Sequence, residues 1–433
     1  AGTAITTGDN NVAVGYQALS TNIGGSKNTA SGYRALYLNT AGTDNVASGY
    51  QSLYTNTTGN YNTGLGVSTL YSNTPASNNT AVGYQALVFN TTGANNAASG
   101  FQALYSNTTG ANNVALGALA LDANTTASNN TAVGYSSLTA NTTGHSNTAL
   151  GHDAVKTATT ATYNTGLGRL ALGAATTGSF NTAVGALSGD AITTGADNTF
   201  VGYQSGSGTT TGADNTAIGQ DALLANTTGA SNVAVGSLAL DANTTASNNT
   251  AVGYASLGAN TTGTANVAVG YNALDASTTA GSLTAVGFQA LSSSVTDGDT
   301  VAMGTNAGVN ATTSYSVIVG SQANGSGAMT GDSNSYLGYA SGYANTSGAN
   351  NTGIGRSALG ANTTGTASVA VGMQALDANT TGSYNNGVGV GSLGANITGS
   401  ANTAVGHAAL GGNTSAANNT AVGYTALLAN TTG

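Results

Sequence analysis

The side chains that could carry acid–base chemistry are few and lie far apart in the chain. Three histidines, His145, His152 and His407, are the only ones among 433 residues. His152 adjoins Asp153, which makes this pair the one candidate for an acid and a base acting together. Adjacent residues of a strand point to opposite faces, so we expect these two side chains to diverge. Catalysis needs a constellation of groups. The sequence predicts none, and we expect no catalytic residue and no enzyme.

Aspartate is the only acidic residue type, and its spacing does not predict a metal site. The chain has 14 acidic residues, all of them Asp. Calcium-binding solenoids carry dense Gly-Gly-x-Gly-x-Asp arrays, a pattern that this sequence lacks. The densest stretch, Asp297-Gly298-Asp299, could supply oxygen ligands to a weak Ca²⁺ site, but turn formation is the simpler role for these residues. We therefore expect no metal and no cofactor.

The recurring sequence Asn-Thr-Thr matches the acceptor motif for N-glycosylation. It also supplies turn residues, because Asn tolerates the left-handed backbone conformation. Both interpretations stay open: turn and ladder chemistry, or a glycan attached to an exposed turn. The candidate glycosylation sites are Asn56, Asn90, Asn107, Asn124, Asn141 and Asn226.

These residues are placed by a 17-residue repeat that fills the chain. The motif Asn-Thr-Ala-Val-Gly, or a close variant, opens at Asn11 and returns every 17 residues to Asn419. One copy is a residue short and the next a residue long between Thr300 and Asn334. The 25 copies give the consensus N-T-A-V-G-Y-x-A-L-x-A-N-T-T-G-x-x, numbered below as positions 1 to 17. Gly, Asn and Thr are poor helix formers, and two short strand-like pieces per copy fit one coil of a β-solenoid.

The predicted fold is therefore all-β, a parallel β-solenoid (β-roll) of about 25 coils. We expect one continuous array over residues 1–433, with a partial repeat at 1–10, repeats over 11–433 and an irregular register over 300–333. Strands stacked at ~4.8 Å would make a rod of about 120 Å. Asn at positions 1 and 12 is expected to form ladders that share amide hydrogen bonds between coils.

Two positions predict the framework of each coil. Position 5 is Gly in every copy, which indicates a positive φ or a close backbone approach. Positions 4 and 9 are mostly apolar, although Ser31, Ser48 and Ser99 occupy position 4, and these two positions predict an inward core ladder. The structural glycines are represented by Gly15, Gly83, Gly134, Gly253 and Gly423, and the core ladder by Val14, Leu19, Val82, Leu87, Val133, Leu138, Val252 and Leu257.

Two further positions predict surfaces. Position 3 is Ala or Gly in most copies, with Phe200, Ile318 and Tyr336 as exceptions. Strand alternation turns position 3 away from position 4, so its small residues predict lateral packing against other chains. Position 6 is variable and often aromatic, which predicts an exposed contact surface that includes Tyr16, Tyr33, Tyr50, Tyr84, Tyr135, Tyr254 and Tyr424.

Composition restricts the partners. The net charge is −9, and five scattered basic residues give no electrostatic footprint for nucleic acid. No apolar run approaches the ~20 residues of a transmembrane helix, so we expect no membrane insertion in this segment. The chain has no Cys, so its fold does not depend on disulfides. It begins without Met and stops within a repeat, which predicts a piece of a longer chain or a subunit joined to others at its ends.

The segments Asn79–Gly83 and Asn402–Gly406 carry a motif that resembles Asn-Ser-x-Ala-Ile-Gly in the heads of trimeric autotransporter adhesins. Similar repeats occur in some phage tail-fibre and virion proteins. The resemblance covers essentially the whole chain through this short motif. It implies a left-handed β-roll, three chains side by side and attachment at a cell or virion surface. The family's head repeat is usually shorter, and the added Asn-Thr-Thr-Gly turn bears on coil shape and oligomeric state.

The leading hypothesis is an extracellular, rod-like homo-oligomer, a trimer or a filament, that acts as the shaft or adhesive head of a fibre. The alternative is a phage tail fibre or surface module whose position-6 aromatics stack on sugars of a host-surface glycan; a host protein is the other candidate partner. An ice-binding solenoid is a minor alternative. Ice-binding faces favour alternating Thr, whereas positions 13 and 14 place two Thr side by side.

Overall fold

The computed structural model describes residues 2, 5–294 and 298–431 and has the predicted solenoid architecture. Each coil contributes one strand of three residues, and its neighbours along the sheet are parallel. The described residues form no helix that could cross a membrane. The chain divides into two compact units, Ala1–Asn215 and Thr216–Gly433. The handedness implied by the adhesin resemblance stays a prediction.

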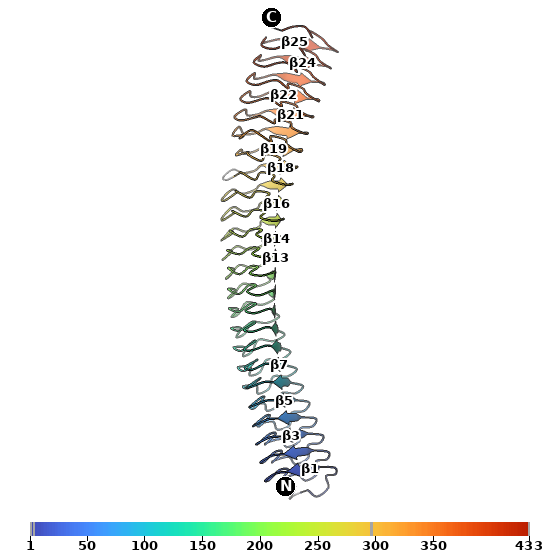
Figure 1. The fold of residues 1–433 in the computed structure, drawn as a ribbon, viewed down its shortest axis with the longest axis vertical. Helices are drawn as coiled ribbons and strands as arrows, with labels where there is room; N and C mark the ends of the chain where they lie inside the picture. Colours follow the sequence, from blue (N-terminus) through green and yellow to red (C-terminus); the bar gives the residue numbers. More distant parts are fainter. Residues whose placement is uncertain (1, 3–4, 295–297, 432–433) are drawn as a thin grey trace. The chain divides into compact units, whose positions relative to one another are not determined.

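The described residues of the first unit form twelve strands, whose ladder can be followed from blue to green in Figure 1. Its register is constant, as shown by the partners Ala13 and Ala30 of the first two strands. The strands are β1 (Val12–Val14), β2 (Thr29–Ser31), β3 (Val46–Ser48), β4 (Thr63–Leu65), β5 (Thr80–Val82), β6 (Ala97–Ser99), β7 (Val114–Leu116), β8 (Thr131–Val133), β9 (Thr148–Leu150), β10 (Thr165–Leu167), β11 (Thr182–Val184) and β12 (Thr199–Val201).

In the second unit, thirteen strands lie within the described residues, and the register disturbance falls among them. Val301 pairs with Val317, 16 residues on, and Val317 pairs with Ser335, 18 residues on, so the ladder continues through the irregular copies. The strands are β13 (Thr216–Ile218), β14 (Val233–Val235), β15 (Thr250–Val252), β16 (Val267–Val269), β17 (Thr284–Val286), β18 (Val301–Met303), β19 (Val317–Val319), β20 (Ser335–Leu337), β21 (Thr352–Ile354), β22 (Val369–Val371), β23 (Asn386–Val388), β24 (Thr403–Val405) and β25 (Thr420–Val422).

The glycine at position 5 ends each strand by a sharp bend, which confirms the predicted role. Its φ is 124° at Gly15 and 120° at Gly83, a region that L side chains rarely adopt. A Cβ on Gly83 would lie 2.5 Å from the carbonyl oxygen of Gly100 in the next coil. The close stacking of coils therefore excludes any side chain there. Gly134, Gly253 and Gly423 have φ values between 131° and 133°.

The strands alternate in the opposite sense to the prediction. Position 3 points into the coil, as shown by fully buried Ala30, and position 4 points outward. The proposed core residue Val14 is 59 % exposed, and Val82, Val133 and Val252 are only half-buried, so their assignment to the core is wrong. Position 3 is small for an internal reason, because the Leu at position 9 already fills the narrow coil. The lateral-packing inference from position 3 is therefore also wrong.

The Leu residues at position 9 form the core that was predicted. Leu19, Leu87, Leu138 and Leu257 are fully buried. These residues lie in turns rather than in a second strand, and their backbone is left-handed, with a φ of 50° at Leu19. Such a conformation is costly for a bulky residue, so burial of the side chain must offset it. The second strand-like piece expected from the sequence is therefore absent.

Asparagine ladders run along each unit, as predicted. At position 12, Asn39 Nδ2 donates to Asn22 Oδ1 at 2.7 Å and to the Gly42 carbonyl at 3.1 Å. At position 1, the Asn45 backbone N–H donates to Asn28 Oδ1 at 3.0 Å. Each side-chain amide thus closes its own turn and joins it to a neighbouring coil. Buried polar groups that are hydrogen-bonded between coils in this way specify one register.

Candidate binding surfaces

The candidate glycosylation sites are buried, which overturns that interpretation. Asn107 is representative: its side chain is fully buried, and its Nδ2 donates to Asn90 Oδ1 at 2.8 Å and to the Gly110 carbonyl at 3.0 Å. The nitrogen that would carry a glycan therefore lies in the ladder and cannot reach solvent in the folded chain. The same burial applies to Asn56, Asn90, Asn124, Asn141 and Asn226.

The His152–Asp153 pair meets rather than diverges, which corrects the strand-based prediction. His152 Nδ1 lies 3.2 Å from Asp153 Oδ2, and Lys156 Nζ lies 3.2 Å from Asp153 Oδ1. The pair is in a turn, where Asp153 has a φ of 56°, so alternation along a strand does not apply. The His152 side chain is exposed and that of Lys156 is half-buried, and the three residues form a polar cluster at the surface.

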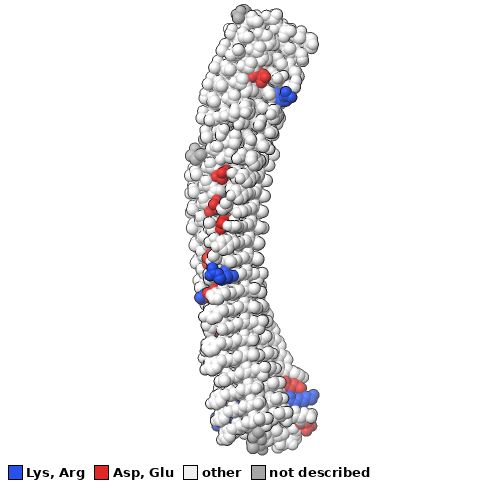
Figure 2. Space-filling view, in the orientation of Figure 1, with Lys and Arg blue, Asp and Glu red and all other residues white. Residues whose placement is uncertain are grey.

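The acidic residues do not gather into a metal cluster in the described part of the chain. No group of three or more His or acidic side chains there is placed to hold an ion. Of the Asp297-Gly298-Asp299 stretch, Asp297 lies outside the described residues. Charged side chains are sparse on the face shown in Figure 2.

The aromatic residues at position 6 are exposed, as predicted, but their rings stack on one another. Tyr33 lies between Tyr16 and Tyr50, with centroid distances of 5.4 and 5.1 Å and nearly parallel planes. An inner ring of such a row therefore has both faces covered and offers mainly its edge. Other position-6 contacts have the same stacked form: Tyr84–Phe101, Tyr135–His152, Tyr254–Tyr271 and His407–Tyr424.

Positions 2 and 4 of the strands form the outer surface of the parallel sheet, called here the sheet face. No strand residue from β1 to β12, or from β13 to β25, carries a charge. Large apolar side chains at position 4 are exposed along this face, and exposed apolar patches of large extent mark interaction sites. They include Leu65, Leu116 and Leu150 in the first unit, and Ile218, Met303, Leu337 and Ile354 in the second.

No protein-family model matches the chain, and no curated protein is significantly similar to it. The resemblance to adhesin heads therefore stays a prediction. Function has to be inferred from the surfaces themselves.

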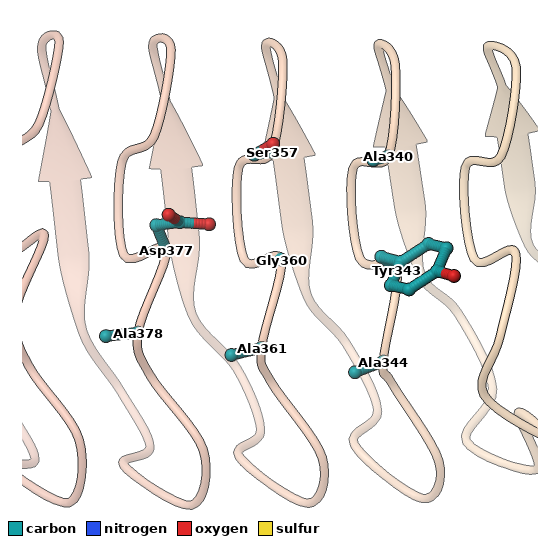
Figure 3. A pocket seen from close by; sticks show the side chains of 8 residues that line it. All are labelled: Ala340, Tyr343, Ala344, Ser357, Gly360, Ala361, Asp377 and Ala378. Carbon is teal, nitrogen blue, oxygen red and sulfur yellow. The ribbon is translucent and has the colours of Figure 1, made fainter.

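A recess of about 460 Å³ interrupts the surface of the second unit at position 10. Figure 3 shows Tyr343 and Asp377 on either side of Gly360, each on its own coil, with Ser357 on the rim. The floor is lined by Ala344, Ala361 and Ala378 at position 11.

Sequence reasoning missed the sheet face and the recess, although signals for the first existed. Ser31, Ser48 and Ser99 at position 4 indicate solvent, whereas position 3 holds no small polar residue in any copy. The recess follows from Gly360 between a Tyr and an Asp at the same repeat position. That signal becomes meaningful only once position 10 is known to point outward.

Proposed function

We propose that this chain is a segment of an extracellular fibre, a homotrimer that acts as shaft or adhesive head and assembles through its sheet face. The observation that supports this most is the uncharged sheet face, whose position-4 side chains are mostly large and apolar and remain exposed: Leu150 is 53 % exposed and Leu337 is 49 % exposed. Apolar surface of this extent is stabilised by removal from water.

A second copy of the same chain is the partner that fits this face. An identical solenoid repeats its position-4 side chains at the same axial spacing. The position-4 side chains of one chain can therefore pack into the grooves over position 2 of the other chain at every coil. Because no strand residue is charged, identical faces meet without like-charge repulsion. A charge at position 4 would instead lie above its own stacked neighbours and face a copy of itself across the interface.

The available length suits association along the chain. The twelve strands of the first unit extend over ~58 Å at the usual strand spacing. With two outward side chains per strand, the sheet face of that unit has an area of roughly 600 Å². This is close to the ~800 Å² that each partner buries in a stable interface. We therefore expect both units to contribute to association.

Several features support an extracellular fibre over the alternatives. The adhesin resemblance points to attachment at a cell or virion surface, and both a bacterial adhesin and a phage tail fibre meet this description. The turn threonines give no support to the ice-binding alternative, because position-13 hydroxyls are engaged: Thr91 Oγ1 donates to the Thr108 carbonyl at 3.0 Å. The absence of an acid–base constellation in the sequence favours a structural protein over an enzyme.

The test is the mass in solution by light scattering. We expect three times the 41.5 kDa chain mass. The double variant Leu150→Lys/Leu337→Lys should be a monomer with an unchanged circular dichroism spectrum. The matched control Thr58→Lys/Thr262→Lys adds the same charge at exposed turn positions and should remain a trimer. A monomeric intact chain, or equal dissociation of both variants, would overturn the proposal.

A further inference from the structure

The recess in the second unit is created by the absence of a side chain. Tyr343, Gly360 and Asp377 occupy position 10 of three successive coils, and this position projects to the surface (Figure 3). Because Gly360 has no side chain, a gap opens between the tyrosine and the carboxylate. The next copy also has a glycine at this position, Gly394, so Asp377 has a bare neighbour on both sides.

Tyr343 has a ring face open to this gap, unlike tyrosines at the same position in the first unit. Tyr54 lies between Tyr37 and Tyr71, with centroid distances of 5.2 and 4.9 Å, so both of its faces are covered. No described aromatic ring makes a ring contact with Tyr343. An unstacked ring beside a gap is a surface on which a flat apolar group of a ligand can pack.

Asp377 supplies an unused acceptor on the opposite side. At the same repeat position, Asp122 accepts a hydrogen bond of 2.6 Å from Thr139 Oγ1 in the next coil. The Asp377 carboxylate accepts no hydrogen bond from any described residue. It leans over Gly360, since a Cβ there would lie 2.6 Å from Asp377 Oδ1.

We propose that this recess binds a neutral pyranose unit of a glycan, with one sugar face on Tyr343 and hydroxyl groups donating to Asp377. A pyranose presents an apolar C–H face and a rim of hydroxyl donors, which matches a free aromatic face opposite a carboxylate. The Ser357 hydroxyl on the rim adds a donor and an acceptor. Acidic sugars are disfavoured, because their carboxylate would face Asp377, whose charge interacts with that of Arg356 in the neighbouring coil. This proposal rests on the adhesive role proposed above and names its ligand class.

A second glycine gap in the same unit provides an internal control. Gly258 at position 10 lies between Asp241 and Asp275, whose Oδ1 atoms are 3.4 and 3.3 Å from the place where its Cβ would be. This gap has carboxylates on both sides and no aromatic ring. It can accept hydrogen bonds but offers nothing to the apolar face of a sugar, so we expect it to bind no pyranose.

Saturation-transfer NMR on the intact chain tests the inference with methyl β-glycosides of glucose, galactose, mannose and N-acetylglucosamine, and with a sialic acid glycoside as the acidic comparison. We expect transfer to at least one neutral glycoside and none to the acidic one. Tyr343→Ala should weaken binding roughly tenfold, and Asp377→Asn should also weaken it. Asp275→Asn in the control gap, and Tyr254→Ala in a stacked row, should leave binding unchanged.

Absence of transfer to every neutral glycoside, a stronger response to the acidic glycoside, or full binding by Tyr343→Ala would each overturn the inference. Position 10 already accepts Gly, Ser, Val and Asp in other copies, so these variants should fold. Light scattering on the same samples reports association separately. Loss of sugar binding in a trimer refutes the recess alone, whereas a monomer that still binds sugar refutes only the fibre assembly.

Discussion

Two regions of the solenoid fill the same core in opposite ways. In a regular coil, such as the one containing β2, the strand contributes Ala30 and the turn contributes Leu36, both fully buried. At β12 the strand contributes Phe200, and position 9 is Gly189 in the preceding coil and Gly206 in its own. A Cβ on Gly206 would lie 2.5 Å from the Phe200 ring. The ring therefore takes the space that two leucines occupy elsewhere.

The second unit repeats the exchange. Ile318 packs against the place where a Cβ on Gly308 would be, at 2.9 Å, and Tyr336 packs against Gly342 at 2.5 Å. Every glycine at position 9 thus adjoins a large residue at position 3. The comparison shows that the coil has a fixed internal volume, which either side of the chain can fill but not both. Interiors packed to crystal density behave in this way.

The largest expected effects come from changing only one side of this exchange, and the first such change restores the consensus leucine alone. Gly206→Leu should destabilise the first unit by roughly 3 kcal/mol, because it overpacks the core against Phe200. The backbone is not the obstacle, since Leu19 has a φ of 50° and Gly206 a φ of 62°. Denaturant unfolding followed by circular dichroism measures the loss.

The compensating variant shows whether volume is the cause. Phe200→Ala alone should cost about 3–5 kcal/mol through the cavity it leaves. Phe200→Ala combined with Gly189→Leu and Gly206→Leu recreates a regular coil and should recover most of the stability. If the triple variant were no more stable than Phe200→Ala, the fixed-volume interpretation would be wrong.

A smaller effect should follow from breaking an asparagine ladder. Asn107→Ala removes the acceptor of Asn124 Nδ2 and the donor to Asn90 Oδ1, each at 2.8 Å. Leaving buried amides without partners costs ~1–3 kcal/mol. Faster hydrogen exchange should appear in the two adjoining coils, with little change elsewhere in the unit.

The chain itself supplies the comparison for this prediction. In three successive coils position 12 is Ala158, Ala175 and Ile192, all buried. An apolar run replaces the ladder there, so no single apolar residue interrupts it between two Asn residues. Replacing Asn107, Asn124 and Asn141 together by Ala should therefore cost less per site than Asn107→Ala alone. An equal loss in the free energy of unfolding per site would show that the unpaired amides at the ends of an interrupted ladder do not destabilise the fold.

The sequence alone predicted the period, the parallel stack, the bend at position 5 and both asparagine ladders, because each depends on local backbone chemistry. It failed on which strand face is inside. Positions 3 and 4, represented by Ala13 and Val14, are both apolar, so strand alternation alone does not show which of them points inward. Hydrophobicity favours the larger residue, Val14, for the core. The occurrence of Phe200 at position 3 together with Gly206 at position 9 indicates the inward face. A position that holds a larger residue where a core residue is smaller must itself lie in the core.

The smallest expected effect is a gain of stability at mildly acid pH. It comes from the glycine gap at Gly258, whose two carboxylates contrast with the Tyr343 recess. Burial raises the pKa of Asp241 above its ordinary value of 3.8, and repulsion from Asp275 and Asp221 adds to this; burial also raises the pKa of Asp275. The folded state therefore holds these protons more tightly than the unfolded chain. Stability should rise as pH falls from neutral through the raised pKa values towards 3.8.

This pH dependence can be separated from the general effect of net charge. Asp241→Asn/Asp275→Asn should flatten the rise of the denaturation midpoint between pH 7 and pH 4. The control Asp9→Asn/Asp299→Asn removes the same charge at exposed positions and should keep the rise. If both variants flattened it equally, the effect would belong to the chain's overall negative charge. If neither did, the carboxylates over Gly258 would not be the groups that take up the protons.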